Sequence, residues 1–221
     1  MAVLGVDGWR GRWVGALLEG RSVRLLVLED VTAALAVPDV DVIAIDMPIG
    51  LSEDGVRACD VAARKRLGRA GSSVFPAPLR QVLAAEDYLE ACRISVEASG
   101  KALSKQAWNL VPAIRSLDDA LGDPPSERVV EVHPELAFRR MDLRVSDPKV
   151  TARGTMQRLT ALRGAMDVEQ ALPDAPPLVP MVDALDACAA AWSAARLAEG
   201  RGECLGDGAV DSRGRPMRIS F

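Results

Sequence analysis

The chain has 221 residues, 49% of them hydrophobic, which suits one large domain or a core with one sizeable insertion. A net charge of −4 at pH 7 excludes a broadly basic nucleic-acid-binding protein, so any nucleic-acid contact must use a local basic patch. Four widely spaced cysteines without a CxxC pair argue against a zinc or redox motif and favour a reducing, cytoplasmic setting. No apolar run reaches the roughly 20 residues that a membrane span needs.

The N-terminal part of the chain predicts strands. Apolar runs at 2–6, 12–20 and 22–30 are separated by turns, a pattern typical of an antiparallel meander. A short helix is expected at 31–36. The continuous apolar run 41–46 favours a central strand that is covered on both faces.

The middle of the chain predicts mainly helices. We expect them at 55–68, 81–98 and 104–120, with a loop rich in Gly, Ser and Pro at 70–80. The region 52–126 is therefore expected to be a mainly helical insertion between core strands.

The C-terminal part returns to the core. A strand at 128–134 precedes helices over 134–141 and 149–166, and the tail 203–221 resembles a short hairpin. An antiparallel start followed by strands with helical connections indicates an α/β fold with a mixed sheet and helices on its faces.

The segment PMVDALDACAAAW, residues 180–192, predicts a helix that carries two acids in an apolar run. Asp183 and Asp186 are three residues apart and share a face with small residues, whereas the large residues lie on the other side. Small residues allow another backbone to approach closely, and that backbone would meet two carboxylates. The alternative is that these acids only stabilise the positive end of the helix dipole.

Three predicted strands also end at or near a carboxylate: Asp7, Asp46 and Glu131. Ligands bind at such strand ends in open α/β sheets, although a lone acid there is more often a turn or cap residue. Together with Asp183 and Asp186, these acids could not all be ionised without a counter-ion. A hard divalent cation, Mg²⁺ or Mn²⁺, meets that need, and a pair of such ions can drive phosphodiester hydrolysis.

This layout resembles the ribonuclease H-like superfamily, and DALDACAAAW is similar to the DxxDA signature of Holliday-junction resolvases. More closely, the chain resembles the DUF429 family, which is described as predicted ribonuclease H-like nucleases. The segments that carry this resemblance are GVDGWRGRWV, AIDMPIGL, GVRACDVAARKRLG, SSVFPAPLR, LSKQAWNL, EVHPELAF and DALDACAAAW.

The resemblance implies a single ribonuclease H-like domain over 1–221, with a mixed five-stranded sheet, helices on both faces and the helical insertion 52–126. It implies metal ligation and catalysis by Asp7, Asp46, Glu131 and Asp186, with Asp183 as an alternative or auxiliary ligand. Related resolvases act as dimers, which leaves a homodimer open for this chain.

The first turn departs from the family pattern, which is closer to GVDGCPGGWV. Trp9, Arg10 and Arg12 replace a Cys, a Pro and a Gly. A bulky, positive turn beside Asp7 could contact phosphate or could narrow the site.

Further candidates for phosphate or substrate contact lie outside the acids. A basic cluster over 57–69 is either a solvated helix surface or a phosphate track, and the following loop offers anion-binding groups or is simply rigid. The lone histidine could be a general base, a metal ligand or a core residue. The candidates are Arg10, Arg57, Arg64, Arg69, Ser72, Ser73, Lys105 and His133.

Three functions are consistent with these patterns. The leading hypothesis is a Mg²⁺- or Mn²⁺-dependent nuclease that hydrolyses nucleic-acid phosphodiester bonds. The second is a non-catalytic ribonuclease H-like scaffold that binds nucleic acid or protein. The third is an actin-like nucleotide-phosphate binding enzyme, because the GVDGW turn resembles the first phosphate turn of that fold, but no second phosphate turn or adenosine motif accompanies it.

Overall fold

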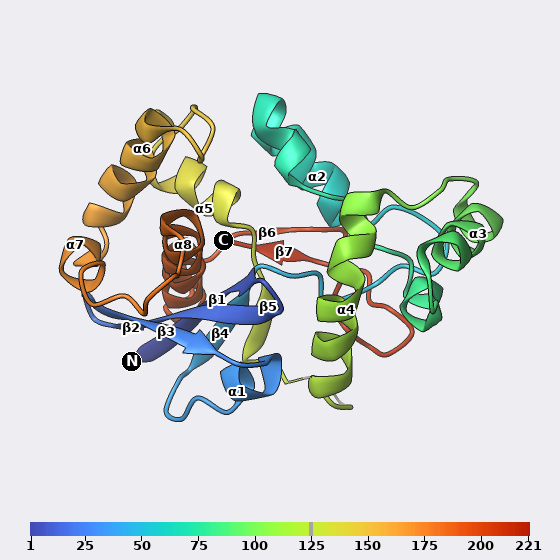
Figure 1. The fold of residues 1–221 in the computed structure, drawn as a ribbon, viewed down its shortest axis with the longest axis horizontal. Coiled ribbons are helices and arrows are strands. Elements are labelled where there is room, and N and C mark those ends of the chain that lie inside the picture. The colour runs from blue at the N-terminus through green and yellow to red at the C-terminus, as the bar shows by residue number, and fades with distance from the viewer. Residues whose placement is uncertain (124–125) are drawn as a thin grey trace. The chain divides into compact units, whose positions relative to one another are not determined.

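The computed structural model describes residues 1–123 and 126–221 of the chain. They form two compact units. Figure 1 labels the helices and strands of both units and colours the chain from blue at the N-terminus to red at the C-terminus. The first unit comprises Met1–Met47, Glu127–Cys204 and Ser220–Phe221, and the second comprises Pro48–Ser126 and Leu205–Ile219. The helical stretch expected at 52–126 lies within the second unit, which also takes up a C-terminal segment that the sequence pattern does not predict.

The first unit is built on a mixed five-stranded sheet in the order β3-β2-β1-β4-β5. Strands β1, β2 and β3 form the predicted antiparallel meander, and β4 and β5 run parallel to β1. This α/β topology confirms the predicted ribonuclease H-like fold. The strands are β1 (Ala2–Trp9), β2 (Arg12–Glu19), β3 (Ser22–Leu28), β4 (Val42–Ile45) and β5 (Val129–Glu131).

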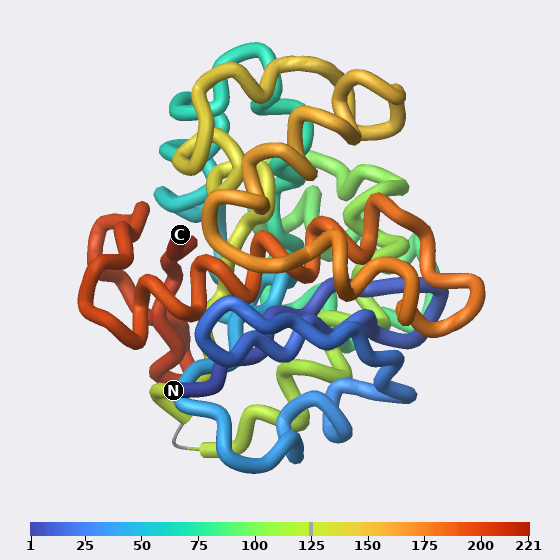
Figure 2. The backbone as a smooth tube through the Cα atoms, turned by 90° about the vertical axis from the view of Figure 1, so that its left-hand side faces the viewer, coloured from blue at the N-terminus to red at the C-terminus, as the bar shows by residue number. Residues whose placement is uncertain are grey.

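Helices cover both faces of this sheet. Helix α8 crosses one face and contacts β1, β2 and β4, whereas α1 lies on the opposite side (Figure 1). Figure 2 shows α8, in orange-red, passing over the blue N-terminal strands. The helices are α1 (Val31–Leu35), α5 (Pro134–Met141), α6 (Ala152–Arg163), α7 (Val168–Ala171) and α8 (Met181–Ala198).

The small residues of α8 let it touch β1 backbone to backbone. A Cβ atom added to Gly5 would lie 2.1 Å from the Ala191 nitrogen and 2.2 Å from the Ala187 oxygen. Both distances are far below van der Waals contact, so only glycine fits at this position of β1. The structure thus confirms that the alanine face of this helix receives another backbone.

The second unit is mainly helical and has its own small core, which includes Val82, Ala91 and Val111. The single helix expected at 81–98 is instead two elements, because Asp87 adopts an extended backbone and caps a new helix by accepting from the Glu90 N–H at 2.8 Å. The elements are α2 (Ala58–Leu67), the 3-10 helices η1 (Gly68–Ser73) and η2 (Arg80–Ala84), α3 (Tyr88–Ser99) and α4 (Lys105–Ala120).

Short strands near the C-terminus, β6 (Cys204–Leu205) and β7 (Ile219–Ser220), pair with each other. Between them the chain turns at Gly214, whose φ is +73° and whose N–H donates to the Asp211 carbonyl. The predicted tail hairpin is therefore present. Within the described residues, no helix combines the length and apolar character needed to cross a membrane.

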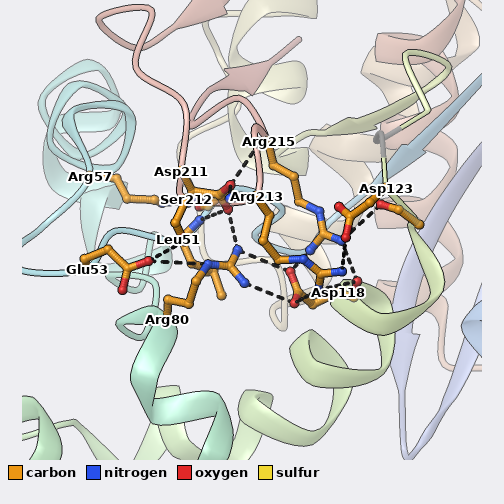
Figure 3. A network of polar contacts seen from close by, with 12 residues as sticks. Leu51, Glu53, Arg57, Arg80, Asp118, Asp123, Asp211, Ser212, Arg213 and Arg215 are labelled. Carbon is orange, nitrogen blue, oxygen red and sulfur yellow. Dashed lines mark hydrogen bonds and ion pairs between the residues drawn. The ribbon is translucent and has the colours of Figure 1, made fainter.

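A buried ion network holds the C-terminal segment to the helices of the second unit (Figure 3). Asp118 of α4 forms ion pairs with Arg80 at 3.1 Å, with Arg213 at 2.7 Å and with Arg215. Asp211 also pairs with Arg80 and accepts from the backbone N–H groups of Arg213 and Arg215, each at 2.9 Å. Arg215 is 0% exposed, so its charge depends on these partners.

Candidate functional site

The register of β1 and β4 brings Asp7 and Asp46 together. Val6 and Ile45 are partners in this parallel pair, and the Asp46 N–H donates to the Val6 carbonyl at 2.9 Å. Because Asp7 and Asp46 each follow a paired residue, they lie side by side on the same face of the sheet. That face is the one against which α8 packs at Gly5.

Helix α8 adds Asp183 and Asp186 to this face. Asp186 is 2% exposed, and Asp183, in the first turn of the helix, is half-buried. The charge of Asp186 acts on both Asp7 and Asp46, and that of Asp183 acts on Asp7. The four aspartates predicted from strand ends and from the helix pattern therefore meet in one place, called here the carboxylate cluster (Asp7, Asp46, Asp183 and Asp186).

Burial and mutual repulsion raise the pKa values in the carboxylate cluster. Burial, followed by the charges of Asp46 and Asp186, holds the pKa of Asp7 well above its usual range. Burial and the Asp186 charge raise the pKa of Asp46 to about 7. Burial also raises the pKa of Asp186 and of Asp183, in each case against an opposing effect of Lys149. The cluster thus has more carboxylates than its own cations can neutralise.

Lys149, in the loop before α6, supplies the cation that lies against the carboxylate cluster. Its Nζ is 2.5 Å from Asp186 Oδ2. Burial alone would lower the pKa of Lys149, but the charge and hydrogen bond of Asp186, followed by the charges of Asp46 and Asp7, raise it. Sequence reasoning missed this residue, because an isolated lysine in a loop carries no local pattern; the excess of acids was the one available signal that a cation was needed.

A buried ion pair lies behind Asp186. Arg158 of α6 donates to both carboxylate oxygens of Glu135, at 2.9 and 2.7 Å. The charge of Arg158 lowers the pKa of Asp186 and that of Glu135 raises it, both less than the burial effect. Sequence reasoning did not identify Arg158. The two side chains bind each other, so their charges largely cancel near Asp186.

The turn between β1 and β2 places Arg10 near the cluster. Arg10 and Gly11 have φ values of +49° and +79°, and the strands continue to pair at Trp9 and Arg12. Two positive φ values are typical of a type I′ hairpin turn, in which Asn-Gly is favoured over a residue such as arginine. Arg10 is exposed, and its charge lowers the pKa of Asp183 against the larger effect of burial. The turn therefore places a positive charge near Asp183, and contact of Arg10 with phosphate stays a prediction.

Glu131 does not join the other acids. It is the register partner of Ile45 on β4, which is in turn the partner of Val6 on β1. Paired residues in neighbouring strands share a face, and Asp7 and Asp46 are one residue further along. Glu131 therefore lies on the opposite face of the sheet, which corrects its expected place among the ligands.

Arg57 is not available to a phosphate backbone, contrary to expectation. It is 3% exposed, and its guanidinium donates to the Asp60 carboxylate at 2.6 and 3.2 Å and to the Gly50 carbonyl at 2.8 Å. Arg64 donates to the Val74 carbonyl at 2.9 Å and holds the loop that follows α2. Arg69 of the same cluster is exposed. The basic cluster thus includes structural arginines, and Asp60, three residues after Arg57, was the sequence signal for the first of them.

The remaining candidates have local structural roles or lie on the surface. Lys105 Nζ lies 4.3 Å from the centroid of the Tyr88 ring, which gives this lysine a cation–π partner. Ser73 Oγ donates to the Ala70 carbonyl at 2.8 Å, and Ser72 is exposed. His133 is half-buried at the residue before α5.

The carboxylate cluster fits a divalent cation in its chemistry but not in its present arrangement. Carboxylate oxygens are the donors that Mg²⁺ and Mn²⁺ prefer. Burial, followed by the charges of neighbouring aspartates, raises the pKa values of Asp7 and Asp46, and a bound cation would offset both effects. Within 1–123 and 126–221, however, no group of three or more His, Cys, Asp or Glu side chains is placed so that it could hold a metal ion. The Lys149 ammonium takes up an oxygen of Asp186.

The raised pKa of Asp46 makes stability depend on pH. With a pKa of about 7 in the folded protein and 3.8 in the unfolded chain, the folded state binds an extra proton between these values, so the free energy of unfolding falls as pH rises from 4 to 7. We expect Asp46→Asn to unfold like the wild type near pH 4 and to be more stable at pH 8, by on the order of 2 kcal/mol.

Urea denaturation in EDTA at both pH values measures this difference. Asp41→Asn, which removes an exposed carboxylate at the other end of β4, is the matched control and should gain nothing at pH 8. An equal stability difference for Asp46→Asn at both pH values would contradict the prediction.

The comparisons with known proteins give one match. A family model described as "Protein of unknown function (DUF429)" matches residues 5–210, which is nearly the whole chain. No curated protein and no solved structure matches.

Proposed function

The chain belongs to the DUF429 family, and for this member we propose a metal-dependent hydrolase of nucleic-acid phosphodiester bonds that works in the cytoplasm. One observation carries the proposal: on a ribonuclease H-like sheet, the ends of two adjacent parallel strands and one helix bring Asp7, Asp46 and Asp186 together. Burial raises the pKa of all three carboxyls, and the charges of neighbouring aspartates raise those of Asp7 and Asp46 further. Strongly perturbed pKa values cluster at functional sites, which supports a functional role for these acids.

Asp7, Asp46 and Asp186 would hold Mg²⁺ or Mn²⁺, with Asp183 as an auxiliary ligand. A bound divalent ion supplies a Lewis acid and activates water for attack on phosphorus. The burial of Asp7 and Asp186 keeps bulk water from two of the carboxylates, which strengthens any charge interaction there. Arg10, exposed on the β1–β2 turn near Asp183, would contact a backbone phosphate.

Two measurements on one set of variants test the proposal. Mn²⁺ titration by calorimetry and a cleavage assay on DNA and RNA, single-stranded, duplex and branched, are made on wild type, Asp7→Asn and Asp186→Asn. We expect each variant to bind Mn²⁺ at least tenfold more weakly, or about 1.4 kcal/mol, and to lose cleavage.

Two further variants sharpen the result. Asp41→Asn removes an exposed carboxylate and should leave both readouts unchanged. Glu131→Gln should also retain Mn²⁺ binding, because Glu131 lies on the other face of the sheet. The proposal is wrong if Asp7→Asn and Asp186→Asn bind Mn²⁺ and cleave as the wild type does.

A second candidate function is a non-catalytic scaffold that binds nucleic acid or protein. The ion pair between Lys149 and Asp186 favours it, because this pair neutralises part of the cluster without any metal. Such a scaffold would show no Mn²⁺-dependent heat in the same titration but would retain ligand binding. Nothing in the described part of the chain favours the actin-like alternative.

A further inference from the structure

We propose that Lys149 is the resident cation of the carboxylate cluster, and that its ammonium and a divalent metal ion compete for Asp186. Metal loading then requires the lysine to leave. This inference rests on the proposed metal-binding function and adds a regulation of the same site. It also explains why the carboxylate cluster has suitable donor atoms for a metal ion although, within the described residues, its side chains are not arranged to hold one. The lysine occupies Asp186 in this arrangement.

The contact between Lys149 and Asp186 is a direct one. Nζ and Oδ2 are 2.5 Å apart, and the Asp186 side chain is only 3% exposed. A carboxylate so deeply buried needs a partner of opposite charge. The nearby Arg158 does not serve as that partner, because its guanidinium binds Glu135 through both carboxylate oxygens. Lys149 therefore neutralises Asp186 in the metal-free protein.

The two members of this pair differ in their access to water. The Lys149 side chain is 47% exposed, whereas Asp186 is held inside by helix α8. The ammonium reaches the cluster from the solvent side and can return to solvent by rotating its flexible four-carbon stem. The carboxylate remains in place, ready for another cation. The exchange is thus a change of side-chain rotamer.

The backbone that carries Lys149 is fixed against α6. Gln157 accepts from the N–H groups of Ser146 and Asp147, at 3.1 and 3.0 Å, and Thr155 Oγ1 donates to the Lys149 carbonyl at 2.9 Å. A Cβ at Gly154 would lie 2.0 Å from the Pro148 oxygen, so loop and helix are in backbone contact. With the loop anchored, the ammonium remains within reach of Asp186 in every loading state and can return when the metal dissociates.

The test compares Mn²⁺ affinity with and without this ammonium. Lys149→Met keeps most of the stem length and removes the charge; Lys149→Gln is a second neutral variant that keeps a donor for Asp186, in case the first folds poorly. Calorimetry at constant pH should show both binding Mn²⁺ about tenfold more tightly than wild type, because the competing cation is gone. Lys101→Met, the loss of an exposed lysine from the second unit, should bind as wild type does.

A second readout needs no metal at all. In EDTA at pH 8, Lys149→Met should lower the melting temperature by about 2–4 °C, and Asp186→Asn in the same chain should cancel that loss. If the neutral variants bind Mn²⁺ no more tightly than wild type, the competition is refuted while the metal site stands. If neither wild type nor the Lys149 variants bind Mn²⁺, the metal-binding function fails and the competition with it.

Discussion

Replacing Gly5 by alanine is expected to abolish stable folding of the first unit. The new methyl group would lie 2.1 Å from the Ala191 nitrogen and 2.2 Å from the Ala187 oxygen, and both are backbone atoms that no rotamer change can move. The strand or the helix would have to shift by more than an ångström through a close-packed core. Overpacking that is relieved by shifts of side chains costs about 1–3 kcal/mol of stability. We expect Gly5→Ala to lower the free energy of unfolding by more than that, because here the backbone itself must move.

Thermal and urea denaturation measure the effect, and Gly8 on the same strand provides the matched control. A Cβ at Gly8 would meet the end of the Met47 side chain at 3.6 Å and the Trp13 ring at 3.8 Å, and both distances are ordinary contacts. Gly8→Ala should therefore change stability by no more than about 0.5 kcal/mol. If Gly5→Ala is destabilised by less than about 1 kcal/mol, helix and strand are not in backbone contact.

Removing the carboxylate of Asp118 is expected to be the second most damaging change. Asp118→Ala would leave Arg80, Arg213 and the fully buried Arg215 without the acid that all three share. Arg80 would keep its ion pair with Asp211, but the buried Arg215 would lose its acidic partner. Breaking a buried ion pair from one side costs about 3–5 kcal/mol, because the remaining charge is left uncompensated. We expect that cost to release the C-terminal segment 205–219 from the helices of the second unit.

Denaturation gives the loss of stability, and limited proteolysis followed by mass spectrometry shows whether cleavage begins within 205–219. Asp119→Ala is the control, because it removes an exposed acid from the next position of the same helix. An Asp118→Ala protein with wild-type stability and an uncleaved C-terminal segment would show that the network contributes little.

The parts of the fold that could be predicted are those with a local pattern. Alternating or continuous apolar runs located β1 to β5, and the small and large residues of 180–192 predicted the side on which α8 receives a backbone. Asp7 and Asp46 were predicted because each comes at the end of an apolar run, so their positions depend on a local pattern alone.

Glu131 shows why one acid was misplaced by the same rule. Side chains alternate between faces, so a shift of one residue in the point where a strand ends moves its last acid to the other side of the sheet. The sequence pattern cannot locate a strand end to one residue. The face on which Glu131 lies follows from its pairing with Ile45, and this pairing is known only from the structure.

Lys149 could not be predicted for a different reason. It reaches Asp186 across 37 residues of chain, and the contact depends on how the loop before α6 folds back on that helix. The same holds for Asp118, whose partners Arg213 and Arg215 are 95 and 97 residues away. Such pairs leave no trace in spacing or composition.

The contact at Gly5 makes the geometry of the carboxylate cluster independent of how well the apolar core packs. The backbones of β1 and α8 touch directly, without a side chain between them, two residues before Asp7 and one residue after Asp186. The spacing of these two carboxylates is therefore set by main-chain atoms, which do not change rotamer. Substitutions elsewhere in the apolar core can lower the stability of the fold while leaving that spacing unchanged. Core residues can therefore change during evolution without altering the geometry of the carboxylate cluster.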